Sequence, residues 1–294
     1  MKKIAVLTSG GDSSGMNACI KYLFDECKKN KLNLVGVLHG YNGLMKGEFV
    51  ELTKAKVDEY FNQGGSFIKT SRSELFKTDE GKALALEQLK KNKIDYLIVI
   101  GGNGSLCGAK SLSKFYLNII FLPGTIDNDI YYTDNTIGFD TAVNNATNAV
   151  DIMMDSMKSN DRGFVVEVMG RKCPDIAIQV GKKTNADLVV ADPVSFDEIL
   201  KKLLLKKLGD APLIVVRENL VDVNSLAEFL TNKLNKTFKS TILGYLQRGG
   251  NPTKQEKLLT QKLSKMAIKQ IVLDKKTMAI GTKNGKTVAV DFTK

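Results

Sequence analysis

The sequence predicts an α/β protein with mainly parallel sheets. Short apolar runs recur along the chain, segments of helical period separate several of them, and glycine-rich turns follow three of them. Strands that alternate with helices in this way form parallel sheets covered by helices on both faces. We therefore expect two Rossmann-like domains, each with three α/β/α layers.

The expected strands are apolar runs that are too short to be helices. Those up to about residue 122 build the first sheet, those from about residue 164 build the second, and the helix after Gly138 connects the two. In chain order, these runs are residues 4–8, 34–38, 96–100, 119–122, 164–168, 188–191 and 213–216.

The expected helices are marked by apolar side chains that recur at helical spacing and so fall on one stripe. Each stripe must be buried against another element, which predicts a helix that covers a sheet. The stripes are Met16, Ile20, Leu23, Phe24 and Cys27, then Ala142, Ala146, Ala149, Val150 and Met153, and finally Leu226, Phe229, Leu230 and Leu234.

The composition excludes several classes of protein. With 294 residues, 43% of them apolar, the chain can form one large domain or two ordinary ones. It has no 18-residue apolar run, so we expect no membrane span, and residues 1–8 are interpreted as a strand rather than as a signal peptide. Cys19, Cys27, Cys107 and Cys173 lack metal-ligand spacing, which is typical of reduced cysteines in a cytoplasmic protein.

The formal net charge of +11 raises the question of a nucleic-acid partner. The lysines, however, are spread over solvated helix faces, as in Lys28-Lys29 and Lys90-Lys91, and no basic patch with interleaved aromatic residues is present. We therefore favour anionic small substrates over nucleic acid.

The glycine-rich turns are candidates for phosphate binding. Glycine lets the backbone approach a polyphosphate, and the helix that follows offers free amides and the positive end of its dipole. The alternative is that such turns only reverse the chain and that Asp12 only caps the first helix. The turns are Thr8-Ser9-Gly10-Gly11-Asp12-Ser13-Ser14-Gly15-Met16-Asn17, then Gly101-Gly102-Asn103-Gly104-Ser105, and Met169-Gly170-Arg171.

The most informative run is Pro123-Gly124-Thr125-Ile126-Asp127-Asn128-Asp129, which follows the apolar residues 118–122. It brings two carboxylates and a hydroxyl to the carboxyl end of a buried strand, where open α/β sheets bind their ligands. An aspartate there can accept the proton of an attacking alcohol, and a second aspartate can serve a metal ion.

These runs resemble those of the phosphofructokinases, and the resemblance extends from the first strand to about Ala279. Further matching runs are Tyr41-Asn42-Gly43-Leu44, Gln63-Gly64-Gly65, Thr136-Ile137-Gly138-Phe139 and Val165-Val166-Glu167-Val168-Met169-Gly170-Arg171. The resemblance to the bacterial ATP-dependent enzymes implies transfer of the γ-phosphoryl group of ATP to the 1-hydroxyl of fructose 6-phosphate, with Mg2+ as cofactor. It also implies a nucleotide-binding domain of residues 1–138 plus 252–294 and a sugar-phosphate-binding domain of residues 139–251.

The same resemblance implies roles for individual residues. Asp127 is expected to be the base, with Thr125 and Asp129 beside it, and Arg171 and Arg72 are expected near the transferring phosphate, where positive charge offsets the charge on the phosphoryl oxygens. Gly11 completes the catalytic set. The expected nucleotide contacts are Gly11, Tyr41, Arg72, Lys77, Gly102, Asn103, Gly104 and Ser105, and the expected metal ligands are Asn103 and Asp129.

The expected substrate contacts include the catalytic residues and a second group of side chains. In the family, the arginine that matches Arg162 comes from a neighbouring subunit, which implies a homotetramer or a homodimer. The substrate contacts are Thr125, Asp127, Asp129, Arg162, Met169, Gly170, Arg171, Glu218, Lys239, Tyr245 and Arg248.

Two small residues indicate which phosphoryl donor the protein uses. Diphosphate-dependent relatives resemble this pattern but carry an aspartate at the position of Gly104 and a lysine at the position of Gly124. Glycine at both positions leaves room for a nucleotide, so ATP is favoured over diphosphate.

Several positions depart from the family pattern. Asn103 stands where the family has an aspartate associated with Mg-ATP, Tyr245 replaces a histidine and Lys239 replaces an arginine. We therefore weigh an active kinase against a catalytically weak paralogue that binds nucleotide or sugar phosphate as a regulatory or partner subunit.

Regulation is also expected to differ from that of the bacterial family. Lys21, Asp25, Met154 and Gly209 occupy positions where the family presents basic residues to ADP or phosphoenolpyruvate. We expect weak or absent regulation by these effectors. The family's usual final segment does not follow residue 294, and we expect an effect on stability or assembly.

Overall fold

The computed structural model describes residues 1–116, 118–206 and 208–292. Its internal contacts divide the chain into two compact units. Unit 1 consists of Met1–Asp140 and Arg248–Lys294, and unit 2 consists of Thr141–Gln247. The assignment of a nucleotide-binding and a sugar-phosphate-binding role to two such domains stays a prediction.

Unit 1 is built on a mainly parallel sheet with the strand order β12-β11-β5-β4-β1-β2-β3, and β6 pairs with β5 beside this path. The pairs β2–β3 and β11–β12 are antiparallel. The strands are β1 (Lys3–Ser9), β2 (Asn33–Val37), β3 (Phe49–Glu51), β4 (Tyr96–Gly101), β5 (Ile119–Thr125), β6 (Ile137–Gly138), β11 (Met278–Lys283) and β12 (Lys286–Asp291).

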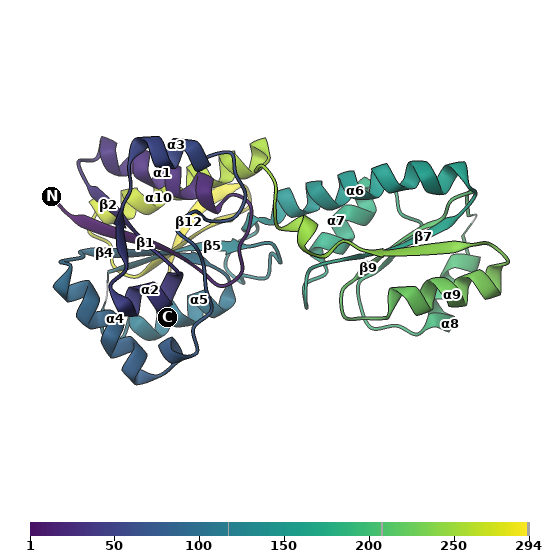
Figure 1. The fold of residues 1–294 in the computed structure, drawn as a ribbon, viewed down its shortest axis with the longest axis horizontal. Coiled ribbons are helices and arrows are strands. Elements are labelled where there is room, and N and C mark those ends of the chain that lie inside the picture. Colours follow the sequence, from purple (N-terminus) through teal and green to yellow (C-terminus); the bar gives the residue numbers. More distant parts are fainter. Residues whose placement is uncertain (117, 207, 293–294) are drawn as a thin grey trace. The chain divides into compact units, whose positions relative to one another are not determined.

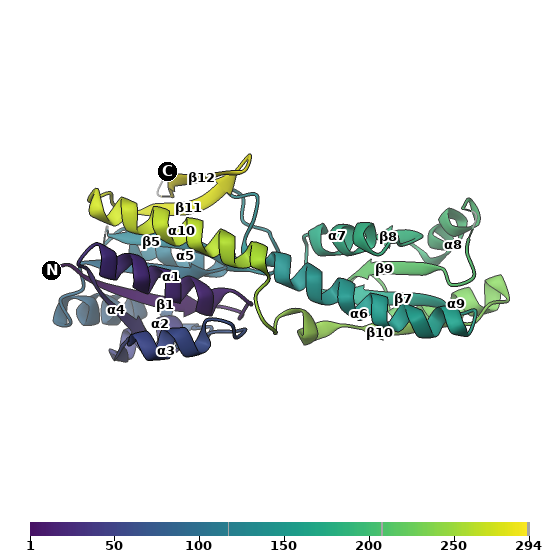
Figure 2. The ribbon, with the colours of Figure 1, turned by 90° about the horizontal axis from the view of Figure 1, so that it is seen from above.

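Helices cover both faces of this sheet (Figures 1 and 2). One apolar cluster joins the sheet to α1, α3 and α10, and a second cluster joins its other face to α2, α4 and α5. The helices are α1 (Met16–Lys29), α2 (Gly40–Lys46), α3 (Lys54–Tyr60), α4 (Asp79–Lys91), α5 (Asn103–Leu112) and α10 (Lys254–Val272), with the short 3-10 helix η1 (Leu75–Lys77).

The α1 helix follows directly from its sequence. The whole predicted stripe from Met16 to Cys27 is buried against the sheet and its neighbours. Lys28 and Lys29 lie in the last turn, where positive charge is favourable beside the negative end of the helix dipole.

Unit 2 is built on a parallel sheet with the order β10-β7-β9-β8. Figure 1 shows α6 and α7 on one face of this sheet and α8 and α9 on the other. The elements are α6 (Phe139–Ser159), which begins at the end of unit 1, β7 (Gly163–Val168), α7 (Asp175–Lys183), β8 (Leu188–Val190), α8 (Phe196–Leu204), β9 (Leu213–Arg217), α9 (Val223–Leu234), β10 (Phe238–Ile242) and the 3-10 helix η2 (Gly244–Gln247).

The predicted fold class is confirmed, since both sheets are mainly parallel and carry helices on both faces. Every expected strand is present, with small shifts at its ends. The expectation that only strands up to about residue 122 build the first sheet was wrong, because β11 pairs with β5 and brings the C-terminal hairpin into that sheet.

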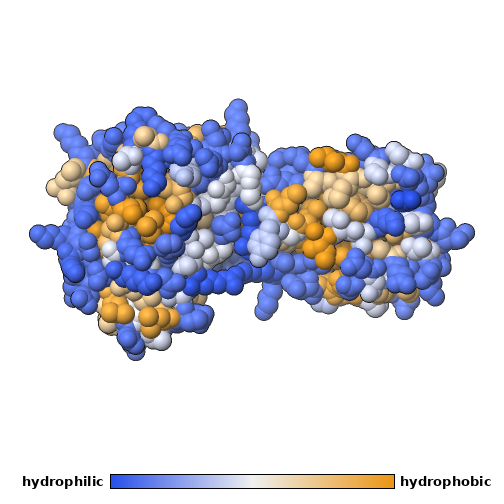
Figure 3. Space-filling model, in the orientation of Figure 1, coloured by the Kyte–Doolittle hydropathy of each residue, from blue (hydrophilic) through white to orange (hydrophobic). Residues whose placement is uncertain are grey.

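One face of the molecule shows its surface hydropathy. Hydrophilic residues make up most of the face shown in Figure 3. Among the residues that the structure describes, no helix is long and apolar enough to cross a membrane.

Candidate active site

Three loops of unit 1 lie at the carboxyl ends of the neighbouring parallel strands β1, β4 and β5. The connection from β1 to β2 runs through α1 on one face of the sheet, whereas the connection from β4 to β5 runs through α5 on the other face. Open α/β sheets bind ligands at the edge where the connections change face in this way. The first two glycine-rich turns and the run after β5 therefore meet at a favoured binding edge.

Side-chain hydrogen bonds join the first two loops. Ser105 Oγ donates to the carbonyl of Ser9 at 3.0 Å, and Tyr41 Oη donates to the carbonyl of Ser105 at 2.9 Å. The Tyr41 ring is buried and stacks on Phe76 with a centroid distance of 3.8 Å, and burial raises the pKa of its hydroxyl. Tyr41 thus supports the Ser105 turn from within the core.

Asp127 lies in a loop that is held in one conformation. Its side chain is 5% exposed, and its N–H donates to Thr125 Oγ1 at 3.2 Å. Asn128 has a left-handed backbone with φ of 54°, and its Oδ1 accepts the N–H of Thr136 at 3.0 Å. Thr136 Oγ1 in turn donates to the carbonyl of Thr125 at 2.6 Å. These bonds close the loop and hold the backbone of Asp127 at the end of β5.

Asp129 and Asn103 form the exposed part of this edge. Asn103 Nδ2 donates to the main-chain carbonyl of Asp129 at 3.0 Å, which joins the first residue of α5 to the loop after β5. The described residues contain no group of three His, Cys, Asp or Glu side chains that could hold a metal ion alone. Mg2+ usually takes one or two carboxylates together with substrate phosphates and water, so the carboxylate of Asp129 and the side-chain oxygen of Asn103 fit that mode.

Gly11 and Arg248 approach each other closely. A Cβ on Gly11 would lie 3.0 Å from Arg248 Nη1, so a larger residue would need the end of the Arg248 side chain to shift. Arg248 Nη1 lies 3.4 Å from Asp12 Oδ1.

The alternative that Asp12 caps the first helix was wrong, because α1 has Gly15 at its N-cap and no side-chain cap bond.

Arg72 and Lys77 are both exposed. Arg72 follows Ser71, whose carbonyl accepts the N–H of Gly10 at 3.2 Å, so its backbone is tied to the first loop. Lys77 pairs with Glu74 at 2.7 Å and is 70% exposed.

Gly102 and Gly104 lie at the start of α5, and a Cβ on Gly104 would meet no heavy atom within 4 Å.

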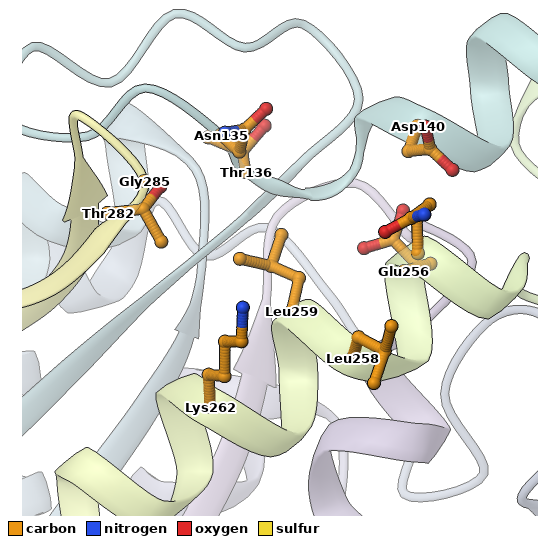
Figure 4. Close-up of a pocket in the computed structure, with 10 residues that line it drawn as sticks. Asn135, Thr136, Asp140, Glu256, Leu258, Leu259, Lys262, Thr282 and Gly285 are labelled. Carbon is orange, nitrogen blue, oxygen red and sulfur yellow. The ribbon is translucent and has the colours of Figure 1, made fainter.

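A separate pocket of about 290 Å³ lies beside α10 (Figure 4). It is lined by the loop before α6, the first turn of α6, the first half of α10 and the β11–β12 hairpin, and none of its lining residues is a predicted site residue. The lining residues are Asn135, Thr136, Asp140, Gln255, Glu256, Leu258, Leu259, Lys262, Thr282 and Gly285.

Unit 2 brings four predicted residues together at the carboxyl end of β7. Glu218 Oε1 accepts the N–H of Gly170 at 2.9 Å and the N–H of Arg171 at 2.7 Å. The N–H of Met169 donates to Gln247 Oε1 at 3.1 Å. The turn that carries Arg171 is thereby bonded to the residue that follows β9 and to η2.

Arg162 and Lys239 lie at the opposite end of the same sheet. Arg162 precedes β7, and Lys239 is in register with Phe164 near the beginning of that strand. The strand Gly163–Val168 spans roughly 20 Å at the usual rise per residue. The structure therefore does not bring Arg162 to the Arg171 turn within unit 2. Tyr245 lies in η2 and is 80% exposed.

Two polar side chains at the Arg171 turn were not predicted from the sequence. Arg217 is 8% exposed and Gln247 is fully buried, and both bond to the main chain of this turn or of its neighbours. A signal for Arg217 was available, because a charged residue directly after the apolar residues 213–216 occupies the same strand-end position that singled out Asp127.

Comparisons with known proteins agree with this geometry. The phosphofructokinase family model matches residues 3–271. A curated relative from Clostridium botulinum, named ATP-dependent 6-phosphofructokinase, is 40% identical over 99% of this chain and 93% of its own length. A relative from Clostridium tetani with the same name is also 40% identical over these shares.

Solved structures show the same fold. The phosphofructokinase of Saccharomyces cerevisiae matches 99% of this chain with a TM-score of 0.90 and 31% identity, and the chain spans 45% of that longer protein. A pyrophosphate-dependent phosphofructokinase from Marinobacter aquaeolei matches the whole chain and 83% of its own length with a TM-score of 0.87 at 18% identity, which shows the fold alone. From the family match and these relatives, the chain belongs to the phosphofructokinase family.

Proposed function

We propose that the protein transfers the γ-phosphoryl group of ATP to the 1-hydroxyl of fructose 6-phosphate and gives fructose 1,6-bisphosphate, a step of glycolysis. The observation that carries this proposal is the carboxylate of Asp127, buried at the end of β5 in a loop closed by the Asn128–Thr136 hydrogen bonds. The name and the 40% identity of the clostridial relatives support it.

Asp127 acts as the general base. It accepts the proton of the sugar hydroxyl while the oxygen of that hydroxyl bonds to the γ-phosphorus and the bond to the ADP oxygen breaks. Its side chain is 5% exposed, which limits competition by water for the same proton. Thr125 and Asp129 flank it on the loop and contribute contacts to the substrates.

The other loops of unit 1 bind the nucleotide. The main-chain amides at Gly11 and at the start of α5, with Gly102, Gly104 and Ser105, face phosphate oxygens. Arg72 and Lys77 add positive charge, and Tyr41 holds the Ser105 turn. Mg2+, bound with the phosphates by Asp129 and the side-chain oxygen of Asn103, would offset their negative charge.

Residues of unit 2 bind the sugar phosphate. Met169, Gly170 and Glu218 contact the sugar, and Arg171 stabilises the transferring phosphoryl group. Tyr245 and Arg248 contribute to binding of the 6-phosphate.

We also propose that Arg162 acts in the site of a neighbouring subunit of a homotetramer or homodimer, since strand β7 separates it from its own Arg171 turn. A glycolytic role implies a cytoplasmic enzyme.

The test is a coupled assay with fructose 6-phosphate, Mg2+ and either ATP or diphosphate. Because a general base contributes roughly 100- to 10,000-fold, we expect Asp127→Asn to lower kcat with ATP by that factor. Asp134→Asn is the matched control, since Asp134 lies in the same loop and bonds the N–H of Asn284 at 2.6 Å.

Two outcomes would count against the kinase. A kcat in Asp127→Asn equal to that of the wild type would contradict the base assignment. Absence of turnover with either donor, together with retained ATP or sugar-phosphate binding in calorimetry, would favour a binding subunit instead.

A further inference from the structure

Arg217 is a buried arginine that the proposed chemistry does not use. It is the last residue of β9 and is 8% exposed. Its Nε donates to the carbonyl of Ala191 at 2.8 Å, and its Nη1 donates to the carbonyl of Arg171. A buried charge is unfavourable unless hydrogen bonds compensate for lost water, so this guanidinium has a defined place only while these carbonyls stay where they are.

The acceptors of Arg217 belong to two other strand ends. Ala191 follows β8, and Arg171 follows β7, so a single side chain joins the carboxyl ends of three neighbouring strands. Glu218, the next residue, holds the opposite side of the same turn. Its Oε1 accepts the N–H of Gly170 and of Arg171, and its own N–H donates to the carbonyl of Val168 at 2.9 Å.

The turn needs this support because its backbone is unusual. Gly170 has φ of 142° and Arg171 has φ of 50°, a left-handed conformation that is unfavourable for a residue with a side chain. Such conformations persist where the surroundings determine them fully. Here the N–H of Arg171 is bound by Glu218 and its carbonyl by Arg217, so both sides of the residue are fixed.

We propose that Arg217 is a positioning residue for phosphoryl transfer, which holds the carbonyl of Arg171 and thereby sets the direction of the Arg171 side chain. This inference rests on the proposed function, in which the guanidinium of Arg171 stabilises the transferring phosphate. Displacement of a catalytic group by about 1 Å can lower the rate roughly 100-fold, so the support of the turn is as important as the arginine that it carries.

The matched control is Lys236, which makes the same kind of link at the other end of the sheet. Its Nζ donates to the main-chain carbonyls of Asp161 at 3.0 Å and of Asp210 at 2.5 Å, just before β7 and β9. Lys236→Met therefore also removes a cation that joins two loops of unit 2, but far from the Arg171 turn.

The kinetic test compares Arg217→Met, Arg217→Lys and Lys236→Met. We expect Arg217→Met to lower kcat at least tenfold with the KM for ATP within twofold, Arg217→Lys to recover part of the loss, and Lys236→Met to keep the wild-type kcat. In an Arg171→Gln background, Arg217→Met should cause no further loss, because residues that act through one group are not additive. A full additional loss in the double variant would overturn the proposal.

Hydrogen exchange tests the support of the turn without any activity. The peptide that covers residues 169–173 should exchange faster in Arg217→Met than in the wild type, with no change in Lys236→Met. Unchanged exchange in Arg217→Met would overturn the role of Arg217. Lack of turnover by the wild type would overturn the proposed function instead, and the exchange result would still decide whether Arg217 holds the turn.

Discussion

Asn103 donates a hydrogen bond of 3.0 Å from Nδ2 to the main-chain carbonyl of Asp129. An ionised aspartate at this position has no donor and could not make the same bond. The asparagine therefore does more than remove a charge from the proposed metal–nucleotide site, since it joins α5 to the loop that carries Asp127.

Asn103→Asp tests which of these two effects is larger. The variant loses a neutral hydrogen bond, which contributes about 1 kcal/mol, and adds a charge-assisted contact to MgATP, which contributes about 2 kcal/mol. We therefore expect MgATP binding to become more favourable by about 1 kcal/mol, and its KM to fall roughly fivefold. Asn118→Asp is the matched control, since Asn118 Nδ2 donates to the carbonyl of Asp95 at 2.9 Å at the other end of β5. A higher KM in Asn103→Asp, with Asn118→Asp unchanged, would show that the hydrogen bond matters more.

The sequence predicted the buried strands well because each is a continuous apolar run, which is how a strand covered on both faces appears. The edge strands were missed because they alternate or are short. In β12, for example, the apolar run is only Val288-Ala289-Val290, and its residues are only partly buried. Asn284-Gly285 between β11 and β12 was a usable signal, since this dipeptide favours a tight hairpin turn and both residues have positive φ.

The site was predicted less completely than the fold. Asp127 could be selected because a polar run at the end of an apolar strand has few other uses. The bond between Asn103 and Asp129 and the link from Arg217 to the Arg171 carbonyl depend on pairing between strands far apart in the chain. Sequence spacing does not report such pairings.

Gly104 allows a test of the phosphoryl donor, and Gly124 allows a test of local packing. A Cβ on Gly104 would lie in open space, so Gly104→Asp should fold normally and lower kcat/KM for ATP at least tenfold, because the side chain would occupy the space proposed for the nucleotide. A Cβ on Gly124 would lie 2.9 Å from Ile100 Cγ2, so Gly124→Ala should lower the Tm. Unchanged ATP kinetics in Gly104→Asp, measured by the coupled assay, would contradict the donor assignment.

Glu167 provides a pH-dependent prediction. Partial burial, followed by the negative charges of Glu218 and Asp222, raises the pKa of its carboxyl above the ordinary value of 4.5. Because the folded state disfavours the ionised form, Glu167 lowers stability above its raised pKa, and this effect disappears as the pH falls to 4.5. We expect Glu167→Gln to raise the Tm at pH 7 but not at pH 4. Glu228→Gln, on the exposed surface of α9, should change neither value, and an equal gain at both pH values in Glu167→Gln would contradict this reasoning.

Lys21 carries the prediction about regulation. Its ammonium pairs with Asp25 on the same helix and lies 3.4 Å from Asp58, which also pairs with Lys54. Burial would lower the pKa of Lys21, but the hydrogen bond and charges of Asp25 and Asp58 outweigh it and raise that pKa. The hydrogen bond from Lys54 lowers the pKa of Asp58, so both partners are charged at neutral pH.

A phosphate that approached Lys21 would therefore meet a cation already neutralised by two carboxylates. At saturating MgATP, we expect phosphoenolpyruvate to leave the fructose 6-phosphate saturation curve of the wild type unchanged and ADP to act only as a competitor of ATP. The double variant Asp25→Asn, Asp58→Asn leaves the charges of Lys21 and Lys54 without these partners and should bind a second ADP, beyond the one in the proposed active site, in calorimetry. Glu26→Gln is the control, since Glu26 pairs with Lys29 on the same helix at 2.7 Å, away from Lys21. A strong ADP effect on the wild type that saturating ATP does not relieve would show that the carboxylates do not block this position.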